Sequence, residues 1–174
     1  MKSFVFLLIL LPSLSLAAPH PATSSSALTA PEKGLYFQHK GFNLKTEGTD
    51  WLPVATESVL DTVRFSSKEK TANGSLSIRT DTVAKNASLE LYARKWMRDY
   101  PSYGFEVLSA KNFTLNGQPA LVVDMLSRSK NKQIRQVILK KDARVAVMTC
   151  LDDKANFNKS LQSCNRIIQS FNWK

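Results

Sequence analysis

The region from residue 105 to residue 151 most constrains the fold, because it holds four β-rich runs separated only by short polar links. The first run ends in Asn116-Gly117, the strongest hairpin signal in the chain. The others cover residues 120–126, 133–139 and 144–151. Links this short predict an antiparallel meander. The runs 120–126 and 144–151 are apolar at both odd and even positions, which predicts a sheet covered on both faces.

Two segments have helical spacing instead. Apolar residues recur at positions 89, 93, 96, 97 and 100, on one side of a helix. Ser88 or Asn86 can cap this helix and Pro101 limits its continuation, so we predict a helix over residues 88–100. In the second segment, positions 157, 161, 164, 168 and 171 share one apolar face. Asp152 or Asp153 is the expected N-cap of that helix.

The N-terminal half supplies further strands. Short apolar segments begin at Leu35, Gly41 and Trp51, and residues 62–66 and 75–82 alternate between apolar and polar. The link between the two alternating segments ends in Asn73-Gly74, a turn dipeptide. Strands, a helix, more strands and a final helix indicate an α+β fold. We expect an antiparallel sheet of about six or seven strands with helices packed on it.

Several short segments occur in the order found in a known family. They are Gly41-Phe42-Asn43-Leu44 with Trp51, residues 88–93, Asn116-Gly117-Gln118-Pro119-Ala120, residues 135–138 and residues 167–171. Through them the chain resembles the PsbP-like and DcrB-like family over residues 35–173. The resemblance implies the PsbP-like α/β/α sandwich, which this family shares with the Ran-binding Mog proteins. It also implies a non-enzymatic accessory or binding protein, since known members mostly assist larger assemblies.

The N-terminus has the features of an export signal. Lys2 precedes an unbroken apolar run over residues 4–11, and small residues follow up to Ala18. The run is far shorter than the roughly 20 residues that span a bilayer. We therefore expect a signal peptide over residues 1–17, a flexible leader over 18–34 and a single PsbP-like domain over 35–174. The protein would be periplasmic or secreted, without a transmembrane segment after cleavage; an uncleaved membrane anchor is the alternative.

The expected export affects the interpretation of the two cysteines, Cys150 and Cys164. In an oxidising compartment a pair of cysteines usually forms a disulfide. A redox pair is the functional alternative, but the C-x-x-C spacing of oxidoreductases is absent. The expected disulfide would pin the last helix to the sheet.

The sequence shows no catalytic set, and we expect neither an enzyme, nor a metal site, nor a cofactor. The two histidines, His20 and His39, lie in the leader and at a polar strand edge. Asp124 stands in an apolar run and is the best candidate for a catalytic carboxylate. The alternative for Asp124 is an ion pair with Arg135 on the neighbouring strand. Calcium binding at Asp152-Asp153 is a weaker interpretation than helix capping, because no EF-hand pattern is present.

Charge is the remaining functional indication. The chain has 24 Lys and Arg residues against 14 Asp and Glu, a formal net charge of +10. Basic residues occur on the first helix at Arg94, Lys95 and Arg98. The predicted anion-binding surface consists of Arg128, Lys130, Lys132, Arg135, Lys140, Lys141 and Arg144. Such a field favours an anionic polymer such as nucleic acid, a lipid surface or an acidic protein. Alternatively, the charge only keeps an exported domain in solution.

Three hypotheses follow, in order of preference. The first is an accessory binding protein of the bacterial envelope with a protein partner. The second is a binder of anionic ligands, lipid head groups or nucleic acid through the basic surface, and the third is a divergent hydrolase that uses Asp124. Sequons at Asn73, Asn86, Asn112 and Asn158 matter only in a eukaryotic secretory pathway. The short signal peptide and the resemblance favour a bacterium.

Overall fold

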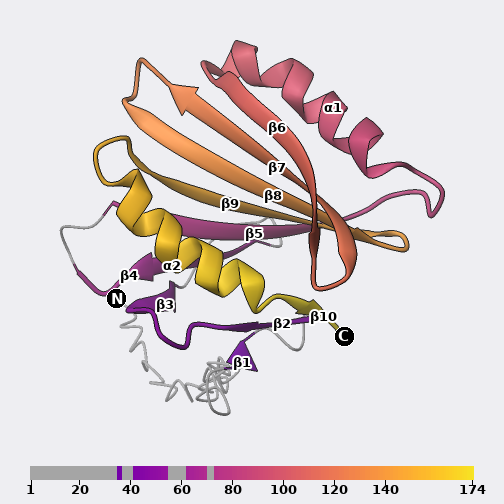
Figure 1. Cartoon of the computed structure of the whole chain (residues 1–174), viewed down its shortest axis with the longest axis horizontal. Coiled ribbons are helices and arrows are strands. Elements are labelled where there is room, and N and C mark those ends of the chain that lie inside the picture. The colour runs from indigo at the N-terminus through magenta and orange to yellow at the C-terminus, as the bar shows by residue number, and fades with distance from the viewer. Residues whose placement is uncertain (1–34, 37–40, 55–61, 70–72) are drawn as a thin grey trace, which may run out of the picture. The chain divides into compact units, whose positions relative to one another are not determined.

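The computed structural model describes residues 35–36, 41–54, 62–69 and 73–174. Short strands come first, followed by a helix, four long strands and a second helix, which is the predicted order (Figure 1). The predicted signal peptide and leader lie outside the described residues. Within those residues, no helix is both long and apolar enough to cross a membrane.

The main sheet has seven strands, all antiparallel. They are β3 (Trp51–Val54), β4 (Thr62–Ser67), β5 (Ser75–Thr82), β6 (Glu106–Leu115), β7 (Gln118–Ser127), β8 (Lys132–Lys141) and β9 (Arg144–Asp153). Across the sheet the order is β3-β4-β5-β9-β8-β7-β6. Strands β6 to β9 therefore form the predicted meander, and β5 pairs with β9. The predicted α+β class and the number of strands are confirmed.

The hairpins of the meander turn through left-handed backbone. Asn116 and Gly117 have φ angles of 51° and 75°, while Asn131 and Asp142 in the next two turns have φ angles of 49° and 54°. Asparagine and aspartate tolerate this conformation better than most residues with side chains. Two consecutive positive φ angles also match the twist of the strands in a hairpin. Each polar link of the sequence thus makes a tight reversal.

A second sheet has three short strands in the order β1-β2-β10. They are β1 (Leu35–Tyr36), β2 (Phe42–Lys45) and β10 (Asn172–Trp173). The Phe42 ring stacks on Phe171 with centroids 5.3 Å apart and meets Trp173 edge-on at 6.4 Å. The sequence predicts the first two strands but not β10, because two residues carry no periodicity. The aromatic rings join the C-terminus of the chain to β2.

Helix α1 (Leu89–Asp99) agrees with the prediction. The Ser88 hydroxyl accepts from the Leu91 N–H at 3.0 Å and caps the first turn. A short 3-10 helix, η3 (Tyr100–Tyr103), follows with Pro101 near its start. It ends at Gly104, whose φ of 79° lets the chain turn towards β6.

Helix α2 (Phe157–Gln169) begins later than predicted. Its N-cap position is Asn156, and the prediction of Asp152 or Asp153 as the cap is wrong, because both residues belong to β9. Asp152 is 2% exposed; it accepts from Ser160 Oγ at 2.5 Å and from the Asp153 N–H at 2.6 Å. The carboxylate therefore stays on the strand and bonds to the first turn of the helix.

Each face of the main sheet has its own core. On the face covered by α2, the fully buried side chains include Phe65, Leu76, Met148, Phe157 and Ile167. On the face covered by α1, the core includes Leu89, Ala93, Val123, Met125 and Ile138. Neighbouring residues of β9 enter opposite cores, as alternation along a strand requires. The sheet is thus covered on both faces, as the apolar pattern predicts, and the arrangement is the α/β/α sandwich that the resemblance implies.

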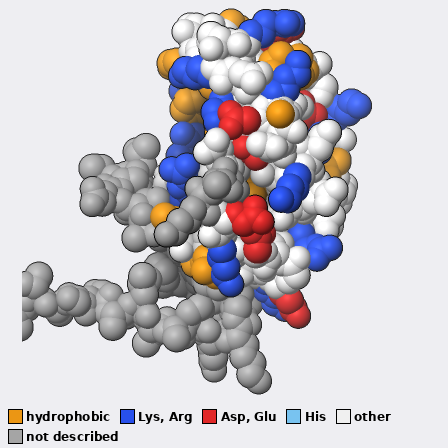
Figure 2. Space-filling view, turned by 90° about the vertical axis from the view of Figure 1, so that its left-hand side faces the viewer, with side chains coloured by type: hydrophobic (Ala, Val, Ile, Leu, Met, Phe, Trp, Pro, Cys, Tyr) orange, Lys and Arg blue, Asp and Glu red, His pale blue; other side chains and the backbone are white. Residues whose placement is uncertain are grey.

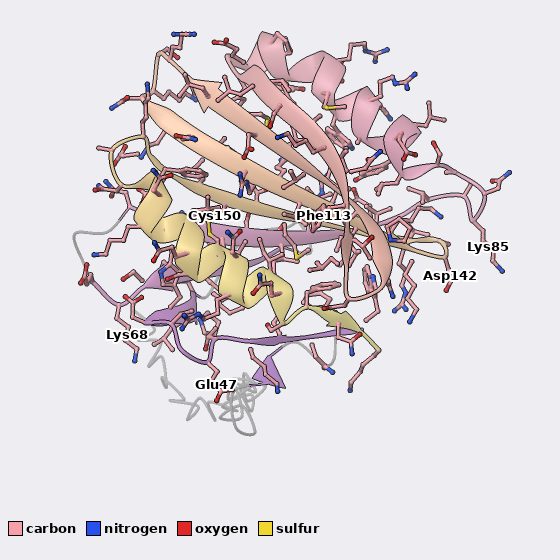
Figure 3. The ribbon with its side chains drawn as sticks, viewed as in Figure 1. Glu47, Lys68, Lys85, Phe113, Asp142 and Cys150 are labelled. Carbon is pink, nitrogen blue, oxygen red and sulfur yellow. A yellow bond between two sulfur atoms is a disulfide. The ribbon has the colours of Figure 1, made fainter. Side chains whose placement is uncertain are left out.

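The predicted disulfide between Cys150 and Cys164 is present. Both residues are fully buried, and their Cα atoms lie 6.0 Å apart. Figure 3 shows Cys150 beside α2. The disulfide joins α2 to the central strand β9, so the predicted link between helix and sheet is confirmed.

Candidate functional site

The structure does not bring the seven predicted anion-binding residues together. One group lies around the β7–β8 turn: Arg128, Lys130 and Lys132. The other lies around the β8–β9 turn, where Figure 3 labels Asp142: Lys140, Lys141 and Arg144. The ten residues of β8 separate the two groups by roughly 30 Å. Arg135 lies between them, within β8.

The group at the β7–β8 turn is partly neutralised. Arg128 Nε donates to Glu106 Oε2 at 2.8 Å, and Lys132 Nζ lies 2.8 Å from Asp153 Oδ1. The hydrogen bond from Lys132, with a second from Asn73, lowers the pKa of Asp153. Two of the three basic side chains in this group therefore already have an acidic neighbour.

The group at the β8–β9 turn bonds mainly to backbone. Lys140 Nζ donates to the Lys85 carbonyl at 3.0 Å, and Arg144 donates to the Gly41 carbonyl at 3.4 Å. The Arg144 guanidinium also lies 4.6 Å from the centroid of the Trp173 ring. Arg144 thus connects the main sheet to the small sheet, which is a structural role.

On the face that Figure 2 shows, Lys and Arg side chains are spread with Asp and Glu side chains between them, so the charge of this face is mixed. Anion binding by the complete set of seven residues stays a prediction. A compact site has to lie where basic side chains from different elements meet.

Such a meeting point is a groove beside α1, which we call the arginine groove. Its volume is about 860 Å³. Arg94 and Arg98 of α1 and Arg128 of the β7–β8 turn line it. Arg128 belongs to the predicted anion-binding surface, and the other two belong to the basic residues noted on the first helix. All three side chains are exposed.

The floor of the arginine groove is apolar. Met97 of α1, Leu126 of β7 and Phe105, just before β6, contribute to it. Arg94 and Arg98 lie one helical turn apart, so both extend over the same side of this floor. The Phe105 N–H donates to the Tyr100 carbonyl at 3.1 Å, which fixes Phe105 at the end of the helix. The groove therefore combines an apolar surface with a rim of three arginines and one acidic residue, Glu106.

The three arginines differ in their partners. Arg128 pairs with Glu106, and Arg98 Nε lies 3.2 Å from Asp99 Oδ1; the two arginine side chains are 75% and 77% exposed. The hydrogen bond from Arg128, together with its charge, lowers the pKa of Glu106. Arg94 forms no ion pair with a residue of the described part of the chain. Exposed pairs of this kind are weak, so an incoming carboxylate can compete for the rim.

The candidate catalytic carboxylate, Asp124, is held in an ion pair. Arg135 donates to both of its oxygens, at 2.7 and 2.9 Å, and the Ser109 hydroxyl donates at 3.2 Å. The hydrogen bonds to Asp124 raise the pKa of the Arg135 guanidinium. This ion pair is the alternative that the sequence offers to a catalytic role. The two histidines, His20 and His39, lie outside the described residues.

Metal ligands do not gather in the part of the chain that the structure describes. No group of three or more His, Cys, Asp or Glu side chains that could hold a metal ion is found among those residues. The buried Asp152 instead accepts hydrogen bonds from the protein itself. The arginine groove therefore remains the most developed candidate site.

Sequence reasoning identified the arginines of the groove but not its floor. The floor depends on the pairing of β6 with β7, which sets Glu106 opposite Leu126 at the end of the sheet. The available signal was the spacing of Arg94, Met97 and Arg98, which mixes basic and apolar residues on one side of a helix. This spacing becomes evidence for a groove only once the strands that lie beside the helix are known.

Known structures share this fold at low sequence identity. The solution structure of cyanobacterial PsbP (CyanoP) from Synechocystis matches with a TM-score of 0.60 and 11% identity, over 87% of this chain and 99% of that protein. The crystal structure of PA94 from Pseudomonas aeruginosa, a protein of unknown function, matches with a TM-score of 0.57 and 18% identity, over 78% of this chain and 93% of that protein. No family model and no curated protein matches the sequence. The chain therefore has the PsbP-like fold.

Proposed function

We propose that this chain is a non-enzymatic binding protein that assists a larger assembly, and that the arginine groove holds an acidic segment of a partner protein. The convergence of Arg94, Arg98 and Arg128 around one apolar floor carries the proposal. A ligand in this groove gains both apolar contact and charge-assisted hydrogen bonds. Arginine next to buried apolar side chains is also the composition that protein interfaces favour.

An acidic protein segment suits the groove better than other anionic partners do. One apolar side chain of the segment can contact Met97 and Leu126 while neighbouring Asp or Glu side chains reach the rim. Duplex nucleic acid is bound through a longer track of phosphate contacts, and single strands also need aromatic side chains for stacking. A lipid surface favours basic groups gathered on one broad face, whereas Arg98 and Arg128 at the groove already pair with Asp99 and Glu106.

We also propose that the protein acts outside the cytoplasm of a bacterium, in the periplasm or after secretion. The signal-like residues 1–17 support export, and the disulfide between Cys150 and Cys164 suits an oxidising compartment. PA94 is described as a candidate regulator, which agrees with an accessory role. N-terminal sequencing of the protein from a periplasmic fraction should find Ala18 first. A chain that keeps Met1 would contradict export with cleavage.

The engagement of Asp124 supports the non-enzymatic proposal. A general acid or base has to exchange a proton with substrate, whereas both oxygens of Asp124 hold Arg135. Asp124→Asn should lower the melting temperature and leave partner binding unchanged. Hydrolysis of p-nitrophenyl acetate or phosphate by the wild type, lost in Asp124→Asn, would overturn the proposal.

The direct test is cross-linking of the tagged mature protein in its native envelope, followed by recovery at low and high salt. The groove variant replaces Arg94, Arg98 and Arg128 by Glu. The matched control replaces Lys85, Lys140 and Lys141 by Glu, which reverses the same number of charges at the other end of β8. We expect one partner protein to be recovered with the wild type and the control, but not with the groove variant. Equal melting temperatures for the two variants would show that folding does not explain the loss.

Other outcomes distinguish the alternatives. Recovery of the partner with the groove variant would overturn the assignment of the groove. Binding only at low salt to phosphatidylglycerol vesicles or to a single-stranded oligonucleotide would support the anionic-ligand hypothesis instead. Apolar contact is insensitive to salt, so a partner held partly by the floor should remain bound at high salt.

A further inference from the structure

A second hollow lies beside α1, over strands β5, β8 and β9, whereas the arginine groove lies over β6 and β7. We call it the indole pocket. Its volume is about 320 Å³, which is in the size range of small-molecule sites. Arg79 of β5, Trp96 of α1 and Thr149 of β9 contribute to its lining. The proposed function uses none of these three side chains, and the two hollows share only Phe105 among the residues that line them.

Two hydrogen-bond donors at this pocket are buried and have no partner. They are Nε of Arg79 and Nε1 of Trp96. Buried donors in folded proteins are nearly always paired, because leaving one unpaired costs free energy. Two such donors on residues that line one pocket are available to an acceptor of a bound molecule.

The surroundings of Arg79 hold its guanidinium in place. Nη2 of Arg79 donates to Asp81 at 3.2 Å, and the Tyr92 hydroxyl donates to the same carboxylate. The guanidinium carbon lies 4.8 Å from the centroid of the Trp96 ring. Asp81 itself does not line the pocket, and its bond engages only one of the three guanidinium nitrogens. A guanidinium fixed in this way can bind an anion without first losing side-chain freedom.

A chain of hydrogen bonds orients a third donor, the hydroxyl of Thr149. The Tyr100 hydroxyl donates to Gln136 Oε1, and Gln136 Nε2 donates to Thr149 Oγ1 at 3.2 Å. Burial raises the pKa of Tyr100 to about 12, so its hydroxyl keeps the proton that begins this chain of hydrogen bonds. Since Oγ1 of Thr149 already accepts a hydrogen bond, its own hydrogen is left to donate to an occupant.

We propose that the indole pocket binds a small organic carboxylate with an aromatic or other apolar body. The oriented polar groups at the pocket are donors, and an ionised carboxylate is an acceptor-only group that pairs strongly with a guanidinium. Phe105, Ile138 and Val147 supply the apolar part of the lining. A neutral sugar needs acceptors as well as donors, and inorganic phosphate has no apolar part. Both therefore match the pocket less well.

The test uses benzoate and benzamide, two probes of nearly equal size that differ in charge. Two-dimensional NMR of the ¹⁵N-labelled protein follows the Trp96 indole N–H signal, which is identified by its loss in Trp96→Phe. Benzoate should shift this signal until saturation, and benzamide should bind at least about tenfold more weakly. Arg79→Gln should weaken benzoate binding by about the same factor. The matched control is Arg64→Gln on β4, because Arg64 is exposed and does not line the pocket.

Three results would overturn the proposal. They are equal affinity for benzoate and benzamide, unchanged benzoate binding by folded Arg79→Gln, and an indole signal that does not move at saturating benzoate. If Arg79→Gln does not fold, Thr149→Val takes its place, because this substitution removes the hydroxyl and keeps the shape of the side chain. The arginine groove is intact in all these variants, so the result is independent of the partner experiment.

Discussion

The two faces of the main sheet are built differently. On one face α2 is cross-linked to β9 through Cys150–Cys164, and Phe42, Phe171 and Trp173 continue its core into the small sheet. On the other face α1 buries only Leu89 and Ala93 fully among its own residues. Trp96 and Met97 are half-buried at the two hollows beside α1. The α2 face therefore has the cross-link and the larger buried core, although a hollow of about 440 Å³ also lies beside α2. The α1 face has two hollows, and Arg79 and Trp96 at one of them carry buried donors without a partner.

This difference separates stability from recognition. Close packing and a cross-link stabilise a fold but leave less room for a ligand. The arginine groove and the indole pocket both lie beside α1, where apolar side chains border unpaired or weakly paired donors. Substitutions on the α2 face should therefore change unfolding most, and substitutions on the α1 face should change binding most.

The largest effect should come from Phe171→Ala. Phe171 is 1% exposed and contacts the rings of Phe42 and Trp173 at 5.3 and 5.0 Å. Its truncation leaves a cavity and should lower the free energy of unfolding by about 4 kcal/mol. Met97→Ala on the α1 face removes a half-buried side chain and should cost about 1 kcal/mol. Urea unfolding followed by circular dichroism measures both; equal losses would contradict the comparison.

Loss of the disulfide should have the next largest effect. Cys150 and Cys164 are 14 positions apart, and a loop of this size stabilises a fold by about 3 kcal/mol. The Cys150→Ala/Cys164→Ala variant should melt about 10 °C lower than the oxidised wild type. Dithiothreitol should lower the melting temperature of the wild type but not of this variant. Benzoate binding at the indole pocket should persist below the melting temperature, since that pocket lies on the other face.

Much of the fold follows from the sequence, because the spacing of apolar residues determines which side of an element is buried. The meander and both helices are predictable on this basis, and the disulfide is predictable from the expected export of a chain with two cysteines. The start of α2 is not. Asp152 resembles a helix cap because it precedes an apolar helical pattern, yet its side chain bonds to Ser160 from within β9. Such a bond depends on tertiary packing, which local sequence does not encode.

The candidate site is less predictable. Residues 128–144 look like one basic cluster because they are close in sequence, but a ten-residue strand places their ends far apart. Conversely, Arg94 and Arg128 are distant in sequence and line one groove. The packing of α1 against β7 and β8 brings them together. Proximity in a sheet is set by pairing, so charge counts along the chain cannot locate the site.

A smaller effect should come from Gly74→Ala, which tests how closely the α2 face is packed. Gly74 belongs to the predicted Asn73-Gly74 turn, but its φ is not positive. A Cβ at this position would overlap with Ser160 Oγ, so glycine is needed here for space. Moving that hydroxyl weakens its bond to buried Asp152. We expect a loss of about 2 kcal/mol in the free energy of unfolding.

A double-mutant cycle gives the control for Gly74→Ala. In a Ser160→Ala background the clashing oxygen is absent, so Gly74→Ala should cost less than in the wild type. Gly117→Ala is a second comparison for the cost of Gly74→Ala. The new Cβ at position 117 would meet no atom within 4 Å, so its cost would come from the φ of 75° and not from a contact. Equal costs of Gly74→Ala in both backgrounds would show that the contact with Ser160 is not the reason for glycine.

The last effect belongs to the α1 face and appears only in alkali. Burial raises the pKa of Tyr100 from the ordinary tyrosine value of 10.0 to about 12 in the folded protein. The unfolded chain therefore loses this proton at lower pH than the folded protein does, and stability falls as pH rises from 10 towards 12. Below pH 10 the contribution of Tyr100 is fully present.

Tyr100→Phe should remove this part of the alkaline loss while also breaking the hydrogen bond to Gln136. The variant should be less stable than the wild type at pH 8, and the difference should narrow between pH 10 and pH 12. Urea unfolding at a series of pH values measures this difference, and absorbance at 295 nm reports tyrosinate directly. A constant difference across the whole range would mean that Tyr100 ionises equally in both states. Tyr100 would then be more exposed to water than the packing of α1 against β8 implies. The α1 face would also be more open than the comparison of the two faces assumes.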